Sequence, residues 1–143
     1  MNQEPFVIER TYNAPIEKVW KAITDKEQMK QWYYDIDEFK PEPGFEFQFE
    51  GNNEDRCYVH LCKVTEVIPE RKLQYSWRYQ GHEGNSFVTW ELFPEGTGTR
   101  LKLTHEGLET FPPIADFAKK NFVAGWTAII GTNLKNFVEK ITV

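Results

Sequence analysis

The chain has 143 residues, of which 40% are hydrophobic and 27% are charged, so it can form one globular domain with a real core. Its formal net charge of −5 argues against nucleic acid or an anionic membrane as the main partner. No apolar run approaches the ~20 residues of a membrane-spanning helix and the first residues lack a signal-peptide pattern, so we expect a cytoplasmic protein without membrane insertion.

The N-terminal third predicts one strand and two short helices. Residues 6–11 are typical of a strand, and Pro15 then opens a helix, because a first-turn position tolerates its missing N–H. Apolar side chains recur in this helix at helical spacing: Ile16, Val19, Trp20 and Ile23. Thr24 or Asp25 can cap a second short helix, which carries Trp32.

From residue 45 to residue 106 the hydrophobic period is two, which indicates strands with one buried face. The clearest example is residues 72–79. There we expect one alternate set (Leu73, Tyr75, Trp77) to be more buried than the other (Gln74, Ser76, Arg78). Short loops join these strands, so the sheet should be antiparallel, with an apolar, aromatic inner face and a charged outer face.

Residues 114–141 predict one long helix of about 42 Å. Its apolar stripe consists of Ile114, Phe117, Ala118, Phe122, Trp126, Ile130, Leu134, Phe137 and Ile141. A helix of this length has to lie across much of the sheet. The sequence therefore predicts a single α+β domain over residues 1–143, in which a curved antiparallel sheet packs against two short helices and one long C-terminal helix.

Three stretches carry a family resemblance: APIEKVWKAITDKEQMKQWY at residues 14–33, VTEVIPERKLQYSW at residues 64–77, and GTRLKLTHEGL followed by GWTAII near the C-terminus. In them the chain resembles the START-like superfamily, also called SRPBCC or birch-pollen-allergen-like. The closest likeness is to bacterial homologues of the activator of the 90-kDa heat-shock chaperone's ATPase. The resemblance implies a helix-grip fold, and it implies that a cavity for a hydrophobic ligand often lies between the long helix and the sheet.

Two glycines in the last helix suggest local departures from regular packing. Gly125 precedes the bulky Trp126, and we expect it to let the backbone approach a strand or an N-terminal helix. The family resemblance implies an apolar residue seven positions after the tryptophan, where this chain has Asn133 followed by Leu134. Gly131 is then an added residue that a π-bulge can absorb.

The predicted function is the binding of an apolar small molecule, aromatic, polyketide-like or lipid-like, between the long helix and the sheet. The predicted ligand-binding residues are Trp32, Phe47, Tyr75, Trp77, Trp90, His105, Phe122, Trp126 and Ile130. The alternative for these side chains is that they simply fill the interior, since aromatic stripes at such spacings are usually core.

Two other functions stay open at this stage. As the family name implies, the protein could interact with a chaperone as an ATPase activator, which would need a large exposed complementary patch. It could also be a small cyclase or hydrolase, but no paired acid and base can be named. Ser76 and Ser86 lack a nucleophile motif, and His105 and Glu106 point to opposite faces of a strand, so His105 is expected to be a hydrogen-bonded core residue.

Neither a cofactor nor a metal is expected. Cys57, His60 and Cys62 look faintly like a metal site, but only His60 and Cys62 can share a face of their strand. The two cysteines lie on opposite faces and are expected to be free thiols. The acidic stretch from Asp35 to Glu38 is expected to be a solvated loop.

Overall fold

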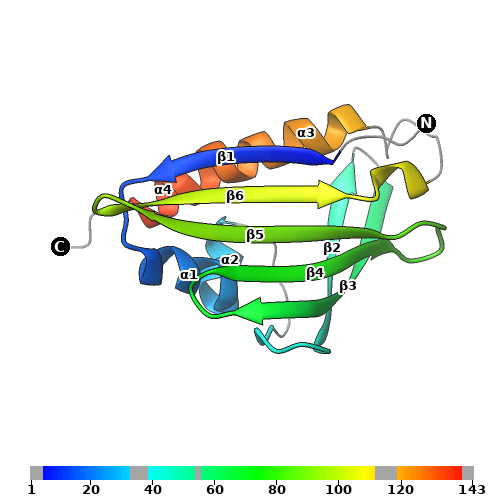
Figure 1. Cartoon of the computed structure of the whole chain (residues 1–143). Helices are drawn as coiled ribbons and strands as arrows, with labels where there is room; N and C mark the ends of the chain where they lie inside the picture. Colours follow the sequence, from blue (N-terminus) through cyan, green and yellow to red (C-terminus); the bar gives the residue numbers. More distant parts are fainter. Residues whose placement is uncertain (1–4, 33–38, 54–55, 112–118, 140–143) are drawn as a thin grey trace.

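In the computed structural model, which describes residues 5–32, 39–53, 56–111 and 119–139, a curved sheet packs against a long C-terminal helix (Figure 1). The strands are β1 (Phe6–Tyr12), β2 (Glu46–Asn53), β3 (Arg56–Ile68), β4 (Lys72–Tyr79), β5 (Ser86–Glu95) and β6 (Gly98–Glu106). The helices are α1 (Ile16–Thr24), α2 (Lys26–Trp32), the short 3-10 helix η1 (Leu108–Thr110), α3 (Lys119–Ala128), the π-helical η3 (Ile129–Leu134) and α4 (Lys135–Val138).

The strands lie in the order β1-β6-β5-β4-β3-β2, and every neighbouring pair is antiparallel. The chain thus runs as a meander from β2 to β6, after which β1 completes the sheet beside β6. The register of β3 against β4 shifts between Val64 and Glu66, and such a bulge increases the local bend of a strand. The predicted antiparallel α+β fold is confirmed.

The two faces of the sheet follow the predicted alternation. Leu73 and Trp77 in β4 are 0% and 4% exposed, whereas Gln74 and Ser76 are half-buried and Arg78 is exposed. The predicted register is therefore confirmed, since a slip by one residue would have inverted the set.

The short helices α1 and α2 lie at one end of the sheet, near α4 (Figure 1). Asp25 is the cap of α2, because its Oδ1 accepts the backbone N–H of Glu27 at 3.0 Å. Trp32 at the end of α2 donates from Nε1 to the carbonyl oxygen of Ala22 at 3.0 Å, which fixes the angle between α1 and α2. No helix within the described ranges is both long and apolar enough to span a membrane.

The C-terminal helix is continuous from Lys119 to Val138, and its middle turn is π-helical. Gly131 lies inside that π turn, so the predicted bulge is confirmed. After Gly131, Leu134 is fully buried and Asn133 is exposed. This is the expected result if Gly131 is an added residue that moves the next apolar position from 133 to 134. The predicted ends, residues 114–118 and 140–141, lie outside the described residues.

The π turn keeps one stripe of the helix on the sheet. The buried residues recur every four positions, at Phe122, Trp126, Ile130, Leu134 and Val138. In a regular α-helix of 3.6 residues per turn, each step of four drifts by about 40° around the axis, and a wider turn reverses part of that drift. Phe137, expected in the stripe, is half-buried, and Val138 takes the fully buried place.

Tyr12 holds the π turn against the sheet. Its hydroxyl donates to the carbonyl oxygen of Ile130 at 2.7 Å, and the side chain is fully buried. Burial raises the pKa of Tyr12 far above its ordinary range, so the hydroxyl remains a neutral donor.

The expectation for Gly125 is wrong. Gly125 is exposed, and a Cβ added there would meet no atom within 4 Å. The backbone therefore makes no close approach at this position. The glycines that do meet backbone closely lie in the sheet region, such as Gly98, whose added Cβ would lie 2.4 Å from the carbonyl oxygen of Tyr12.

Candidate functional site

The nine predicted ligand-binding residues converge between the sheet and the long helix. Their exposed fractions are Trp32 5%, Phe47 6%, Tyr75 1%, Trp77 4%, Trp90 2%, His105 0%, Phe122 8%, Trp126 2% and Ile130 0%. They come from α2, β2, β4, β5, β6, α3 and η3. We call these nine side chains the aromatic layer.

Trp126 lies at the centre of the aromatic layer. Its ring centroid is 5.6 Å from that of Trp77 and 5.6 Å from that of Trp90. Trp90 in turn meets Trp32 edge-on at 6.1 Å and donates from Nε1 to the hydroxyl of Tyr75 at 3.1 Å. Helix and sheet therefore meet through tryptophan side chains that contact one another at angles rather than in parallel stacks.

His105 is the centre of a buried hydrogen-bond chain. The Nε1–H of Trp126 donates to Nδ1 of His105 at 3.0 Å. Because an indole nitrogen can only donate, Nδ1 accepts, and the proton of the neutral imidazole lies on Nε2. Nε2 then donates to the Ser86 hydroxyl at 2.8 Å, and Ser86 donates to the carbonyl oxygen of Trp77 at 2.8 Å.

Burial determines the ionisation state of His105, and the hydrogen-bond chain determines its tautomer. Burial lowers the pKa of His105 from 6.5 to about 3, so the ring is neutral at physiological pH. The predicted role of His105 as a hydrogen-bonded core residue is confirmed. Ser86 and His105 resemble a nucleophile and its base by distance, but the tautomer is the reverse of what catalysis needs, since Nε2 donates to the hydroxyl instead of accepting its proton.

Trp77 differs from the other buried tryptophans. Among the described residues its Nε1 is buried and has no hydrogen-bond partner, whereas Trp32, Trp90 and Trp126 all donate. Around its ring lie Phe49, His60, Tyr79, His105 and Trp126, with centroid distances between 4.9 and 6.4 Å. The aromatic layer thus contains one buried hydrogen-bond donor that has no acceptor among the described residues.

Several residues of this region were not predicted as part of the site. Phe49 shares the period-two pattern of its strand and could have been included on that ground. His60 stacks on Phe49 with centroids 4.5 Å apart, which gives the residue a packing role. Ser86 carries no motif, and its role follows only from the pairing of β5 with β6.

The suspected metal site receives no support from the described residues, which contain no group of three or more His, Cys, Asp or Glu side chains that could hold a metal ion. His60 and Cys62 do share the buried face of β3, as expected. Burial raises the pKa of the Cys62 thiol, so this free cysteine stays protonated. The side chain of Cys57 and the acidic stretch 35–38 lie outside what the structure describes.

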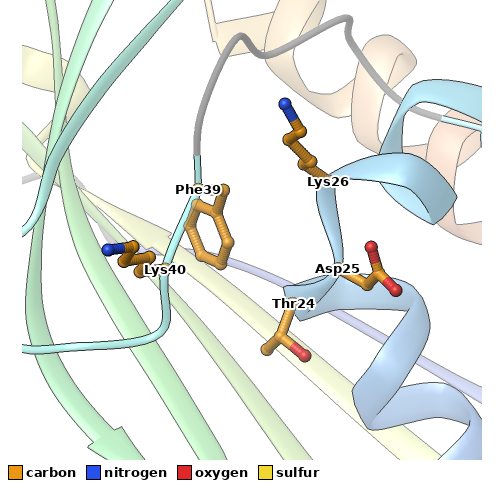
Figure 2. A pocket seen from close by; sticks show the side chains of 5 residues that line it. All are labelled: Thr24, Asp25, Lys26, Phe39 and Lys40. Atoms are coloured by element: carbon orange, nitrogen blue, oxygen red, sulfur yellow. The ribbon is translucent and has the colours of Figure 1, made fainter.

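A surface pocket that the sequence did not predict adjoins the aromatic layer (Figure 2). It has a volume of about 420 Å³ and is lined by Thr24, Asp25, Lys26, Phe39 and Lys40. In Figure 2 Lys26 projects from the start of α2, and Lys40 lies across the pocket beside Phe39. The ring of Phe39 meets that of Phe47 at 5.0 Å and thereby separates this pocket from the interior.

The curved antiparallel sheet, the long helix held against it and the aromatic layer between them define a helix-grip protein of the START-like (SRPBCC) class. This fold is of a kind that binds hydrophobic ligands. Residues 13–139 match the family model described as "Activator of Hsp90 ATPase homolog 1-like protein", and the chain belongs to that family.

Solved structures of other chains share this fold. Protein CV1439 from Chromobacterium violaceum has a TM-score of 0.82 at 21% identity, with 96% of this chain and 98% of that one covered. MLL2253 from Mesorhizobium loti has a TM-score of 0.78 at 26% identity, covering 98% and 100%. BH1534 from Bacillus halodurans has a TM-score of 0.76 at 26% identity, covering 97% and 100%. No curated protein matches the chain with significance.

Proposed function

We propose that this protein binds an apolar small molecule, aromatic, polyketide-like or lipid-like, between the long C-terminal helix and the sheet. The observation that carries the proposal is the composition of the aromatic layer. It combines a large apolar surface from seven elements with a few fixed polar groups, which is the make-up of small-molecule sites in general. Affinity would come from buried apolar area at about 25 cal/mol per Å², less the cost of ordering.

The polar groups of the site would orient a ligand rather than react with it. His105 is neutral, and both of its nitrogens are engaged, so it cannot take a proton from a bound molecule. The hydroxyl of Ser86 is fully buried and donates to a backbone carbonyl. Binding without catalysis is therefore the function that these residues support best, and a cyclase or hydrolase role has no acid–base pair among them.

The chaperone-interacting role that the family name suggests is the second candidate. It would require an apolar or charged surface that complements the chaperone. The exposed large hydrophobic side chains among the described residues are Val7 and Ile68, which lie on β1 and β3, strands separated by three others in the sheet. They form no common patch, so small-molecule binding is favoured. A cytoplasmic location remains a prediction from the sequence.

The first test is native mass spectrometry of freshly purified protein, in which a co-purified mass of small-molecule size is expected. The second is Trp126→Ala, because Trp126 lies between Trp77 and Trp90 at the centre of the aromatic layer. In an interior filled by side chains, this truncation should lower the free energy of unfolding by about 3 to 5 kcal/mol. Beside a ligand cavity the loss should be smaller, and binding should change instead.

Tryptophan fluorescence titrated with flavonoids, polyketides and fatty acids measures that binding. Trp20→Phe is the matched control, since Trp20 is half-buried in α1 and is not part of the aromatic layer. The control should titrate as the wild type does. If no compound changes the fluorescence, no mass co-purifies and Trp126→Ala is severely destabilised, the interior is a packed core and the proposal is refuted.

A further inference from the structure

The unpartnered indole nitrogen of Trp77 indicates what kind of molecule the aromatic layer accepts. Nearly all buried polar groups in proteins have a hydrogen-bond partner, and leaving one unpaired costs about 1 to 3 kcal/mol. Trp77 is 4% exposed, and its Nε1 has no partner in the described part of the chain. A donor of this kind is most simply satisfied by an acceptor that arrives with the ligand.

Two of the side chains packed against Trp77, those of His105 and Trp126, offer its donor no acceptor. His105 offers no lone pair, because Nδ1 accepts from Trp126 and Nε2 carries the proton donated to Ser86. Trp126 is itself a donor. Phe49 and His60 meet the Trp77 ring edge-on, with interplanar angles of 79° and 85°. The Trp77 ring is thus packed among aromatic rings, and its Nε1–H is the donor in this cluster that has no partner among the described residues.

The electrostatics of the interior restrict the charge of that guest. The buried polar side chains among the described residues are His60, Ser86, Thr89, Thr99 and His105. None of these is a lysine, arginine, aspartate or glutamate, and His105 is neutral. A carboxylate placed in the aromatic layer would lose its hydration without gaining a cationic partner, which is strongly unfavourable. A neutral oxygen acceptor meets no such penalty.

We propose that Trp77 is the specificity-determining donor of the site, and that its Nε1–H donates to the oxygen of a neutral, planar aromatic ketone or quinone. This inference rests on the proposed function, because it assumes that a ligand occupies the aromatic layer. The proposed donor excludes fatty acids as the preferred class of ligand, because their carboxylate is charged. It also disfavours plain hydrocarbons, because they leave the Nε1–H of Trp77 unpaired.

The test compares two rigid tricyclic probes, 9-fluorenone and fluorene, which differ in a carbonyl group against a methylene. Affinities are measured by isothermal titration calorimetry for the wild type, Trp77→Phe and the control Trp20→Phe. The wild type and the control should prefer fluorenone by about fivefold, the factor that corresponds to ~1 kcal/mol for one net hydrogen bond. Trp77→Phe should bind both probes equally.

A spectroscopic readout separates donation from mere packing. The carbonyl stretch of bound fluorenone should lie at lower frequency in the wild type than in Trp77→Phe. The indole N–H resonance of Trp77, identified by its absence in Trp77→Phe, should shift when fluorenone binds and stay in place with fluorene. If Trp77→Phe does not fold, the ratio of the two affinities in the wild type decides alone.

The outcomes distinguish this inference from the proposed function. Equal affinity of the wild type for fluorenone and fluorene, or an unmoved Trp77 resonance, overturns the role of Trp77 while binding itself stands. Failure of both probes to bind overturns the proposed function and the inference with it. 9-Oxofluorene-4-carboxylate is the charged probe, and if it binds as tightly as fluorenone, the requirement for a neutral ligand is wrong.

Discussion

The burial of His105 predicts a specific loss of stability in mild acid. Its pKa is about 3 in the folded chain, against an ordinary value of 6.5. Well above pH 6.5 the ring is neutral in both states and contributes no pH dependence. Between pH 6.5 and about pH 3 the unfolded chain binds a proton at this ring and the folded chain does not, so the free energy of unfolding decreases as the pH falls.

The magnitude follows from the width of that window. One pH unit corresponds to about 1.36 kcal/mol at full difference in proton binding, so lowering the pH from 6.5 to 4.5 should remove roughly 2 to 3 kcal/mol through His105 alone. Carboxylates also titrate at the lower end of this range, so the effect has to be measured as a difference. His105→Gln is the matched variant, because the amide oxygen can accept from Trp126 and the amide N–H can donate to Ser86 without ionising.

The assay is urea denaturation followed by circular dichroism at pH 7.0, 6.0, 5.0 and 4.5 for both proteins. The wild type should lose stability with falling pH more steeply than His105→Gln, and the two curves should run parallel above pH 7. If the two proteins show the same slope between pH 6.5 and pH 4.5, His105 is either accessible to protons or already charged, and the buried chain through Ser86 and Trp126 is wrong.

Two further predictions concern the C-terminal helix, and both are measured by urea denaturation. Gly125→Ala should raise the free energy of unfolding by about 0.5 to 1 kcal/mol, because the site is exposed and helical. The control Gly98→Ala should lower it, because the added Cβ would meet the carbonyl oxygen of Tyr12. A loss of stability in Gly125→Ala would contradict the open surroundings of that glycine. Tyr12→Phe should lower the free energy of unfolding by about 1 to 3 kcal/mol, because it removes the buried hydrogen bond to the Ile130 carbonyl, and an unchanged value would show that this bond contributes no net stability.

The features that the sequence predicted well are those that depend on hydrophobic period. The alternation around Trp77 and the stripe through Trp126 follow from one buried face per element, and burial dominates the free energy of folding. The π turn at Gly131 was predictable for the same reason, because an extra residue has to be absorbed if Leu134 is to stay on the sheet. Periodicity therefore fixes which side chains meet in the interior.

The polar contacts of the site were not predictable in this way. Val88 lies opposite His105 in the β5–β6 pair, which places Ser86 diagonally next to that ring, and only the strand register shows this. Gly125 was misjudged because a glycine in a helix is compatible with both a close contact and an open surface. Phe39 lies in a segment without any period, so neither its burial nor the pocket beside it could be expected.

The hydrogen bonds and the ring contacts hold the long helix to the sheet in different ways. Tyr12 in β1 and His105 in β6 bond directly to the helix, at Ile130 and Trp126. These two bonds fix its distance and rotation on the β1–β6 side of the sheet. On the β4 side Trp77 meets Trp126 through ring contact, and its own donor is unused. Ring contacts tolerate small displacements that directional hydrogen bonds do not, so if the aromatic layer binds a ligand as we propose, we expect it to enter on the Trp77 side.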